Sequence, residues 1–528
     1  MIILGISYLS SRNTSACIIK NGSLVAFSEE ERFNRIKHAP NIFPLKAIEF
    51  CLNTANITLA DVDKIAIGQD GNIQDNNSNR MTELVSSLLS EDSVEKLMWY
   101  PHHNCHAISS IIPSKFETTN YMTSDGFGDS NAGIYGYFDG ETLNNLGVIQ
   151  SDQSLGGFYA WATWFLGFKP NSHEGKTMGL ACYGEVDTTL LPELSITNTD
   201  HVGLIECDSN AYKEYFCSKM NSTIKLNIDK NILSTDSVNL ASTIQSLFEK
   251  YISSYLDSLM SNGKSNNLCL AGGSFLNCTS NGKISKRTDI DKLFIQPASN
   301  DSGCALGAAI LCHKEMTATW PDIDFDTAYW GSEFDDLYVE DYLIKHDINY
   351  QIVSPSEHLA NLINEDMVVG YFQGKSEVGP RALCHRSILA NPTKKENLDR
   401  VNTIKNREFW RPLAPVMTEE DFHDIVESKH LSPFMLMACE VKEEWRSILP
   451  ATTHIDNSCR PQSINKSQNP IIHAALMKFK ELTGVPVFMN TSFNVASEPL
   501  VDSPKDAINT FYNSGLDALI INKFCILK

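Results

Sequence analysis

The stretch from Leu240 to Gly273, LASTIQSLFEKYISSYLDSLMSNGKSNNLCLAGG, decides the fold class of this 528-residue chain. Apolar residues recur at three- and four-residue steps over 238–260, which is the period of one face of an α-helix. The run Leu268-Cys-Leu-Ala271 is typical of a short buried strand, and Gly272-Gly273 follow it directly. A helix that leads into a buried strand ending in paired glycines predicts an α/β fold whose backbone N–H groups approach a phosphate.

The N-terminal part predicts the same strand-and-hairpin unit twice. An apolar strand at 2–8 precedes a hairpin around Asn21-Gly22, and a strand at 121–125 precedes a hairpin around Asp139-Gly140. Asn-Gly and Asp-Gly are strong signals of tight hairpin turns. The chain is therefore expected to begin the same kind of sheet twice.

The length predicts two to four packed units, at about 100 to 200 residues per domain. The acidic stretch 320–326 breaks the periodicity, and Met367-Val-Val-Gly-Tyr-Phe372 begins a new α/β pattern. We therefore expect an N-terminal domain over 1–345 and a C-terminal domain over 346–528.

Charge and cysteine usage exclude several classes of protein. The chain has 64 acidic and 43 basic residues, a net charge of -21, which disfavours a broad DNA-coating role. Its 14 cysteines include no C-x-x-C pair, which argues against zinc ribbons and redox dithiols and fits buried thiols in a reducing cytosol. No apolar stretch is long enough to span a bilayer. We expect a cytoplasmic protein with no membrane partner.

Two histidines form a candidate metal pair. His102 and His106 lie four residues apart, so on a helix both imidazoles project from one face. The same residues would also suit an ordinary polar helix N-terminus. Asp125 follows a predicted strand and Asp301 precedes an apolar helix, as ligand-binding groups of α/β sheets often do. Two imidazoles and two carboxylates suit iron, zinc or manganese better than calcium.

A basic segment stands out in this acidic chain. Residues 370–411 hold nine Lys and Arg against four acids, a net charge of +5. Its cations lie among Gly, Pro and apolar residues and could bind a small polyanion, although a solvated basic face is the usual meaning of such a run. Stretches 458–462 and 490–494 are predicted loops that could complete a phosphate pocket or be ordinary turns.

The stretch His173-Glu-Gly-Lys176 precedes the small apolar run Met178-Gly-Leu-Ala181. We predict a charged loop that lines a cleft. The alternative is a surface pair of Glu174 and Lys176 that contributes little to stability.

Taken together, ordered motifs over nearly the whole chain resemble the nodulation and antibiotic O-carbamoyltransferases of the NodU/CmcH type, a family that includes tobramycin carbamoyltransferase. The motifs that carry the resemblance are Glu29-Glu-Glu-Arg-Phe33, Arg35-Ile-Lys-His38, His102-His-Asn-Cys-His-Ala107, Glu174-Gly-Lys-Thr-Met-Gly-Leu-Ala181, Gly272-Gly-Ser-Phe-Leu-Asn277, Gly379-Pro-Arg-Ala-Leu383, Arg386-Ser-Ile-Leu389, Arg411-Pro-Leu-Ala-Pro415 and Asn490-Thr-Ser-Phe-Asn494.

The resemblance implies an α/β enzyme with two domains. The N-terminal domain would have the duplicated actin-like ATPase (ASKHA) fold of the tRNA threonylcarbamoyl-transferase, and the C-terminal domain would be YrdC-like. The C-terminal domain would make carbamoyl-adenylate from carbamoyl phosphate and ATP. A metal site in the N-terminal domain would then support transfer of the carbamoyl group to an acceptor hydroxyl.

The resemblance also implies roles for individual residues. A metal, most often iron(II), would be held by His102, His106, Asp125 and Asp301. The nucleotide, with its magnesium, would lie along Glu174, Lys176, Gly272, Gly273 and Asn277. Carbamoyl phosphate and the ATP phosphates would be bound by Arg381, Arg386, Lys405, Arg411, Arg460 and Ser492.

One position departs from the family pattern. The family carries a His shortly after its first strand, and Arg12 stands in the corresponding stretch here. Arg cannot act as a general base, because its pKa stays above about 12. Either deprotonation of the acceptor falls to Lys37, His38 or His103, or the acceptor needs less activation. Alternatively, Arg12 contacts a phosphate of an anionic acceptor.

Three classes of function remain open. The leading hypothesis is an O-carbamoyltransferase acting on a small-molecule hydroxyl. A nucleic-acid acceptor, either tRNA or a hydroxymethylated base, is disfavoured by the net charge. A non-catalytic actin-like nucleotide switch would leave the basic segment unexplained. The sequence leaves the oligomeric state open, with a homodimer as one option.

Overall fold

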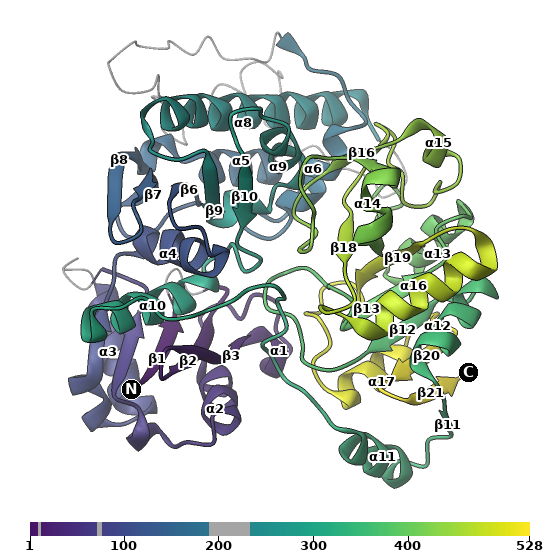
Figure 1. The fold of residues 1–528 in the computed structure, drawn as a ribbon, viewed down its shortest axis with the longest axis horizontal. Coiled ribbons are helices and arrows are strands. Elements are labelled where there is room, and N and C mark those ends of the chain that lie inside the picture. The colour runs from purple at the N-terminus through teal and green to yellow at the C-terminus, as the bar shows by residue number, and fades with distance from the viewer. Residues whose placement is uncertain (9–11, 71–75, 189–232) are drawn as a thin grey trace. The chain divides into compact units, whose positions relative to one another are not determined.

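The computed structural model describes the chain except for residues 9–11, 71–75 and 189–232. The fold is mixed α/β, as the periodicity predicts (Figure 1). Contacts divide the chain into two compact units. The first unit comprises 1–10, 19–23 and 59–323, and the second comprises 11–18, 24–58 and 324–528.

The N-terminal sheet has five strands in the order β3-β2-β1-β4-β5. Their bounds are Ile2–Ser7 for β1, Ser15–Lys20 for β2, Ser23–Glu29 for β3, Lys64–Ile67 for β4 and Leu97–Trp99 for β5. Asn21 and Gly22 both have positive φ, 53° and 81°, which is the backbone of the tight turn that their sequence predicts. The first hairpin prediction is therefore confirmed.

A second sheet has five strands in the order β10-β9-β6-β7-β8. The bounds are Thr119–Thr123 for β6, Asn131–Phe138 for β7, Leu143–Gln150 for β8, Asn267–Ala271 for β9 and Lys292–Ile295 for β10. Strand β6 is parallel to β9 and antiparallel to β7, and β8 completes the hairpin around Asp139-Gly140. When the strands of each sheet are numbered from 1 in chain order, both sheets have the strand order 3-2-1-4-5.

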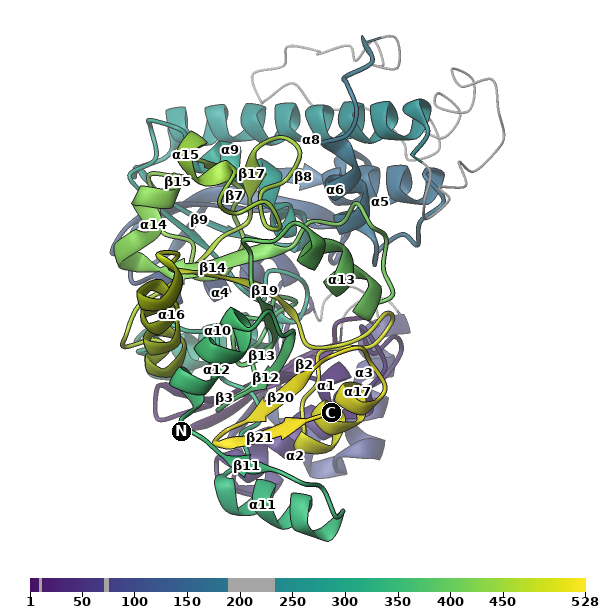
Figure 2. The same cartoon turned by 90° about the vertical axis from the view of Figure 1, so that its right-hand side faces the viewer.

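Helices cover both faces of this second sheet. The long helix α8 (Thr235–Asn262) lies on one side of it and α4 (His102–Ser114) on the other (Figures 1 and 2). Helix α4 packs on α10 (Gly303–Thr317). A Cβ at Gly307 would lie 1.9 Å from the carbonyl oxygen of Cys105, so only glycine permits this close crossing. Helix α8 confirms the helix with one apolar face that is predicted over 238–260.

The remaining helices near these sheets are short. They are α1 (Glu31–Asn34), α2 (Leu45–Thr54), α3 (Asn76–Leu88), α5 (Leu155–Phe165), α6 (Glu174–Ala181) and α9 (Cys278–Ser285). None of the helices in the described ranges is long and apolar enough to cross a bilayer.

The second unit contains an eight-stranded sheet in the order β11-β21-β20-β12-β13-β19-β14-β18. Its strands are β11 (Gln351–Ile352), β12 (Val369–Phe372), β13 (Arg386–Ala390), β14 (Ala414–Thr418), β18 (Gln462–Ile464), β19 (Val487–Ser492), β20 (Ala518–Ile521) and β21 (Phe524–Leu527). A small sheet joins β15 (Val426–Glu427), β16 (Cys439–Val441) and β17 (Ser458–Cys459).

Helices of the second unit complete its core around Phe372, Met489 and Phe493, which are buried. These helices are α11 (Asp336–Lys345), α12 (Pro355–Asn364), α13 (Glu396–Ile404), α14 (Glu419–Ile425), α15 (Glu443–Arg446), α16 (Pro470–Thr483) and α17 (Pro504–Tyr512).

Three loop predictions are wrong, wholly or in part. Residues 174–181 form helix α6, because packing on α5 and α8 outweighs the weak helix propensity of its two glycines. Asn490 to Ser492 lie in β19, and Ser458 begins β17. Asn490 is tolerated in a buried strand because its amide donates to Ala382 O and Gln462 Oε1.

Candidate functional site

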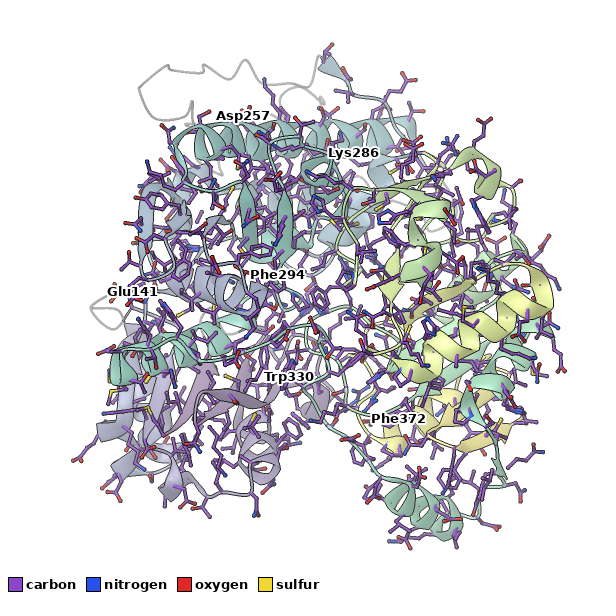
Figure 3. The ribbon with its side chains drawn as sticks, in the orientation of Figure 1. Glu141, Asp257, Lys286, Phe294, Trp330 and Phe372 are labelled. Carbon is purple, nitrogen blue, oxygen red and sulfur yellow. The ribbon has the colours of Figure 1, made fainter. Side chains whose placement is uncertain are left out.

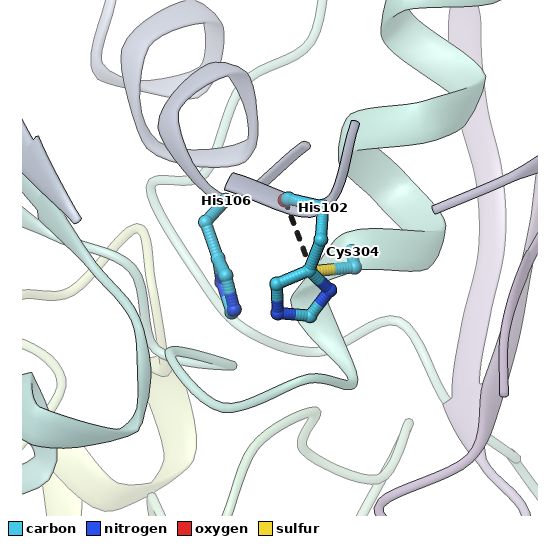
Figure 4. A group of neighbouring side chains, drawn as sticks. All are labelled: His102, His106 and Cys304. Atoms are coloured by element: carbon cyan, nitrogen blue, oxygen red, sulfur yellow. Dashed lines mark hydrogen bonds between the residues drawn. The ribbon is translucent and has the colours of Figure 1, made fainter. Parts of the chain in front are cut away.

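The two predicted metal-binding histidines share one face of α4. The helix begins at His102, so His106 lies one turn further on, and the ring centroids are 4.5 Å apart (Figure 4). Both side chains are fully buried. The helical prediction for this pair is confirmed, and the structure brings the rings together.

Asp125 and Asp301 meet the two histidines. Oδ2 of Asp125 lies 3.1 Å from Nε2 of His106. Oδ1 of Asp301 lies 3.8 Å from Nε2 of His102 and 3.9 Å from Nε2 of His106. One ligand atom of each of the four residues lies within 4.8 Å of the others. The end of β6 and the start of α10 thus bring both carboxylates to the histidines.

The protonation states of this group suit a divalent cation. Burial lowers the pKa of His102 well below its usual value, so the imidazole is neutral and can ligate. Burial raises the pKa of Asp125, but hydrogen bonding and the charge of His106 outweigh it and hold this pKa low. Within the described residues, Nε2 of His102 is buried and has no hydrogen-bond partner. An orphaned ligand atom beside two carboxylates fits a metal.

Cys304 also contacts this group, and sequence reasoning missed it. Its Sγ lies 3.7 Å from Nδ1 of His102 and 3.8 Å from the carbonyl oxygen of His102 (Figure 4). Cys304, His102 and His106 form a second group that could hold an ion. The sequence signal that could have indicated Cys304 as a ligand is its place three residues after Asp301, in the first turn of α10.

Asp129 is a second residue that sequence reasoning missed. Its Oδ2 accepts from the backbone N–H of His102 at 2.7 Å, and its Oδ1 accepts from that of Asp70 at 3.1 Å. The carboxylate therefore stabilises the N-terminus of α4, where Pro101 makes no side-chain cap. An acid four residues after Asp125 was the only sequence signal.

The predicted nucleotide-binding glycines lie against Asp125. Gly272 has φ of +101°, and a Cβ there would come within 2.2 Å of Ser124 O. A Cβ at Gly273 would lie 3.0 Å from Oδ1 of Asp125. The strand end predicted from the glycine pair therefore adjoins the group of His102, His106, Asp125 and Asp301, called the His-Asp group below, and the glycines permit this close packing.

The other nucleotide-binding candidates lie on the helices above. Asn277 caps α9 and exchanges hydrogen bonds with Gln245 of α8. Glu174 begins α6, and the ammonium of Lys176 lies 5.4 Å from the ring centroid of Phe168. Contacts of α6 and α9 with α8 bring these elements together.

The three predicted catalytic candidates are divided between the two units. His103 belongs to the first unit, and its ring nitrogens contact Asn131 O at 3.1 Å and Thr123 Oγ1 at 3.3 Å. Burial lowers the pKa of His103 to about 4. Arg12 and Lys37 belong to the second unit, where the charge of Lys37 affects Lys405.

Lys405 is the buried member of a cation cluster in the second unit. Its ammonium donates to the backbone oxygen of Ser492, to Ser492 Oγ at 3.2 Å and to Asn494 Oδ1 at 2.8 Å. Burial lowers the pKa of Lys405 well below its usual value, and the charges of Arg407, Arg411 and Lys37 lower it further. The structure thus brings the predicted Lys405 and Ser492 together.

Arginines extend this cluster. Burial lowers the pKa of Arg407 well below its usual value, and Arg411 and Arg460 lower it further, while Glu408 opposes them. Arg460 also lowers the pKa of Arg411. Mutual repulsion among buried cations is costly, and a bound polyanion would relieve it.

The guanidinium of Arg386 is hydrogen-bonded to the protein backbone. Its guanidinium donates to four backbone carbonyls, those of Gln373, Gly374, His385 and Ser332. It also lies 3.6 Å above the ring of Phe372, which Figure 3 labels. These contacts fit a structural role for Arg386. Arg381 lies on the loop between β12 and β13.

Comparison with known proteins finds two family models, several relatives and several solved structures that are similar to this chain. The family model described as carbamoyltransferase N-terminus matches residues 2–91 and 78–310, and the one described as carbamoyltransferase C-terminus matches 360–528. Nodulation protein NolNO of Sinorhizobium fredii is 33% identical over 97% of this chain and 78% of its own. The 3'-hydroxymethylcephem-O-carbamoyltransferase of Amycolatopsis lactamdurans is 36% identical over 48% of this chain and 47% of its own. Full-length HypF, solved in a phosphate- and nucleotide-bound form, matches 60% of this chain and 56% of its own with a TM-score of 0.40 and 13% identity.

Proposed function

Because the chain belongs to the carbamoyltransferase family, whose enzymes transfer carbamoyl groups, we propose that it is an ATP-dependent O-carbamoyltransferase. The C-terminal domain makes carbamoyl-adenylate from carbamoyl phosphate and ATP. The His-Asp group of the N-terminal domain is the place where the carbamoyl group passes to a hydroxyl. The acceptor is a small molecule, since a net charge of -21 disfavours a nucleic acid.

The cation cluster around Lys405 is the observation that carries this proposal. Besides burial, the charges of Arg407 and Arg411 lower the pKa of Lys405, in a chain whose overall charge is strongly negative. The charges of Arg411 and Arg460 in turn add to the effect of burial on the pKa of Arg407. Carbamoyl phosphate and ATP are both polyanions, and buried guanidinium and ammonium groups are the ligands that recognise them. A solvated basic face would not bury these charges.

Formation of carbamoyl-adenylate requires cationic groups that stabilise negative charge on the leaving groups. Water releases phosphate from carbamoyl phosphate and leaves carbamate. An oxygen of carbamate then attacks the α-phosphorus of ATP, and the bond to the departing pyrophosphate breaks. Negative charge develops on both leaving groups, and Lys405, Arg411 and Arg460 stabilise it.

Transfer needs a different set of groups. The acceptor oxygen attacks the carbamoyl carbon, the bond to AMP breaks, and the hydroxyl proton must be removed. His103, a neutral imidazole whose ring centroid lies 5.1 Å from that of His102, is our candidate base, and Lys37 is the other. Arg12 is a candidate contact to an anionic acceptor. A divalent ion, held by His102, His106, Asp125 and Asp301, would polarise the carbamoyl oxygen.

The domain assignment is part of the proposal. We assign 1–345 to a duplicated actin-like ATPase fold and 346–528 to a YrdC-like domain. The shared strand order of the two five-stranded sheets supports duplication. The glycine pair at the end of β9 supports a nucleotide site in the N-terminal domain.

The test is incubation of the enzyme with ATP, magnesium and carbamoyl phosphate, while pyrophosphate and carbamoyl-adenylate are measured. We expect pyrophosphate release that depends on carbamoyl phosphate. Acetyl phosphate serves as the matched control, because it carries the phosphate without the carbamoyl group. Absence of pyrophosphate with every divalent metal would contradict the proposal.

A further inference from the structure

A buried ion pair near the N-terminus holds both backbone groups of a single glycine in the C-terminal sequence. Oε1 of Glu29 accepts from the N–H of Gly379 at 2.6 Å, and Nη2 of Arg32 donates to the carbonyl oxygen of Gly379 at 2.7 Å. The guanidinium lies 3.5 Å from Oε2 of Glu29. All three residues belong to the second unit. The pair therefore fixes the loop at this glycine from two sides.

This pair is part of a larger network. The guanidinium of Arg32 also contacts Glu31 at 2.5 Å, and Glu31 accepts from the backbone N–H of His38. The side chains of Glu29 and Arg32 are 6% and 2% exposed. Charges buried to this degree carry a large desolvation cost, which only good partners offset. Their contacts with Gly379 are such partners.

The loop held in this way carries Arg381. Gly379 has φ of +90°, a conformation that glycine adopts freely, and Arg381 follows two residues later. At the other end of the loop, Oε1 of the buried Glu377 accepts from the backbone N–H groups of Leu383 and His385, at 2.7 and 2.8 Å. The loop 379–383 is thus hydrogen-bonded at one end to Glu29 and at the other to Glu377, both of them buried.

The same N-terminal segment holds a second loop. Arg35, directly after α1, donates to the carbonyl oxygens of Pro499 and Leu500 and lies 3.6 Å from Asp506. The loop before Pro499 contains Asn494, whose Oδ1 accepts from the ammonium of Lys405. The segment 29–35 therefore contacts the loop that carries Arg381 and the loop that contacts Lys405.

We propose that Glu29 and Arg32 are positioning residues for the anion site of the second unit, by which we mean Arg381 and the cation cluster around Lys405. The N-terminal segment thereby completes this site. They act through Gly379 on Arg381. This inference rests on the proposed function, because it assigns the pair to the adenylation step. The segment 24–58 then serves a site whose proposed binding residues are all C-terminal in sequence.

The test uses the full-length enzyme and pyrophosphate release from ATP and carbamoyl phosphate. Glu29→Gln keeps an oxygen acceptor for Gly379 but removes the charge that balances Arg32. We expect its KM for carbamoyl phosphate to rise about tenfold or more, with divalent metal binding by the His-Asp group unchanged. Arg32→Lys keeps the charge but loses the planar donors, and we expect a rise in the same direction. It also carries the test if Glu29→Gln does not fold.

Asp517→Asn is the matched control. Asp517 pairs with Arg400 through two contacts of 2.5 and 2.6 Å in the same unit, and neither contacts the loop 379–386 in the described hydrogen bonds. We expect a lower melting temperature with an unchanged KM. Wild-type KM and kcat in both Glu29→Gln and Arg32→Lys, whatever their melting temperatures, would overturn the inference. A wild-type enzyme that releases no pyrophosphate would instead overturn the proposed function.

Discussion

At the scale of single residues, Cys384 adopts a conformation that its side chain disfavours. Its φ is 75° and it is fully buried. Its N–H donates to Ser387 Oγ at 3.0 Å, and its thiol lies 3.4 Å from Gln462 Oε1 and from Asn490 Nδ2. A left-handed backbone costs a residue with a Cβ about 1 to 2 kcal/mol. The surrounding contacts hold Cys384 in this conformation.

Two variants at this position separate the backbone from the thiol. Cys384→Ala removes the thiol and keeps the Cβ, whereas Cys384→Gly removes both. We expect Cys384→Gly to be the more stable of the two by about 1 kcal/mol, the reverse of the usual order. Urea unfolding of both variants measures the difference. An alanine variant as stable as the glycine variant would show that φ is not strained.

The His-Asp group makes a second residue-scale prediction. His106→Ala removes one ligand, and we expect affinity for Fe²⁺ or Co²⁺ to fall by about a hundredfold or more, because the remaining groups no longer satisfy the ion. Titration calorimetry measures the affinity. His103→Asn is the control, since the ring of His103 contacts Asn131 and Thr123. Equal losses in both variants would argue against the proposed ligand set.

At the scale of elements, the approach of α2 to the end of β3 depends on one carboxylate. Glu30 is 2% exposed and accepts from the backbone N–H of Ala47 in the first turn of α2, at 2.9 Å. Burial raises the pKa of Glu30 from 4.5 to about 7, although these backbone hydrogen bonds oppose it. The ionised form is therefore the less favoured one in the folded chain.

This raised pKa sets a direction for stability against pH. The folded state binds the proton more tightly than the unfolded state. The stabilisation is therefore fully present below about pH 4.5 and is lost as the pH rises through about 7. We expect the urea midpoint of the wild type to fall over this range and Glu30→Gln to reduce the fall. Glu357→Gln, at an exposed position of α12, is the control, because Glu357 is not among the groups that shift the pKa of Glu30. A wild-type slope in Glu30→Gln would contradict the prediction.

Elements also show where sequence patterns succeed. The position of α8 follows from apolar periodicity, and those of both hairpins follow from Asn-Gly or Asp-Gly, which act within a few residues. The start of helix α6 and the last three residues of strand β19 are predicted as loops, because their polar residues and, in α6, a glycine suggest turns. Their partners, α8 for α6 and the neighbouring strands for β19, are distant in sequence.

At the scale of the whole molecule, the proposal divides the work between two sites. Lys405→Ala is expected to lower pyrophosphate release by at least about a hundredfold, because it removes the buried ammonium of the cation cluster. His106→Ala is expected to release pyrophosphate at a near wild-type rate and to accumulate carbamoyl-adenylate. Chromatography of the nucleotide products measures both. Equal loss of pyrophosphate release in the two variants would refute this division.

The basic stretch 370–411 contrasts with the negative charge of the whole chain. The basic stretch 370–411 was recognisable in the sequence because composition alone reveals a net +5 within a chain of -21. The burial of Lys405 and the partial burial of Arg407 distinguish a binding site from a solvated face, and composition does not reveal them. Burial depends on β19 and on the loop that follows it, which come about 90 residues later in the chain.

The sequence by itself determined the α/β class, the helix that carries both histidines and the basic stretch, because each depends on neighbours within a few turns of chain. Only the tertiary structure decided that Asp125 and Asp301 meet the histidines, that Cys304 and Asp129 contact His102, and that the segment around Glu29 joins the C-terminal unit. These contacts join residues far apart in the chain, and their formation depends on the packing of whole elements, which no local pattern encodes.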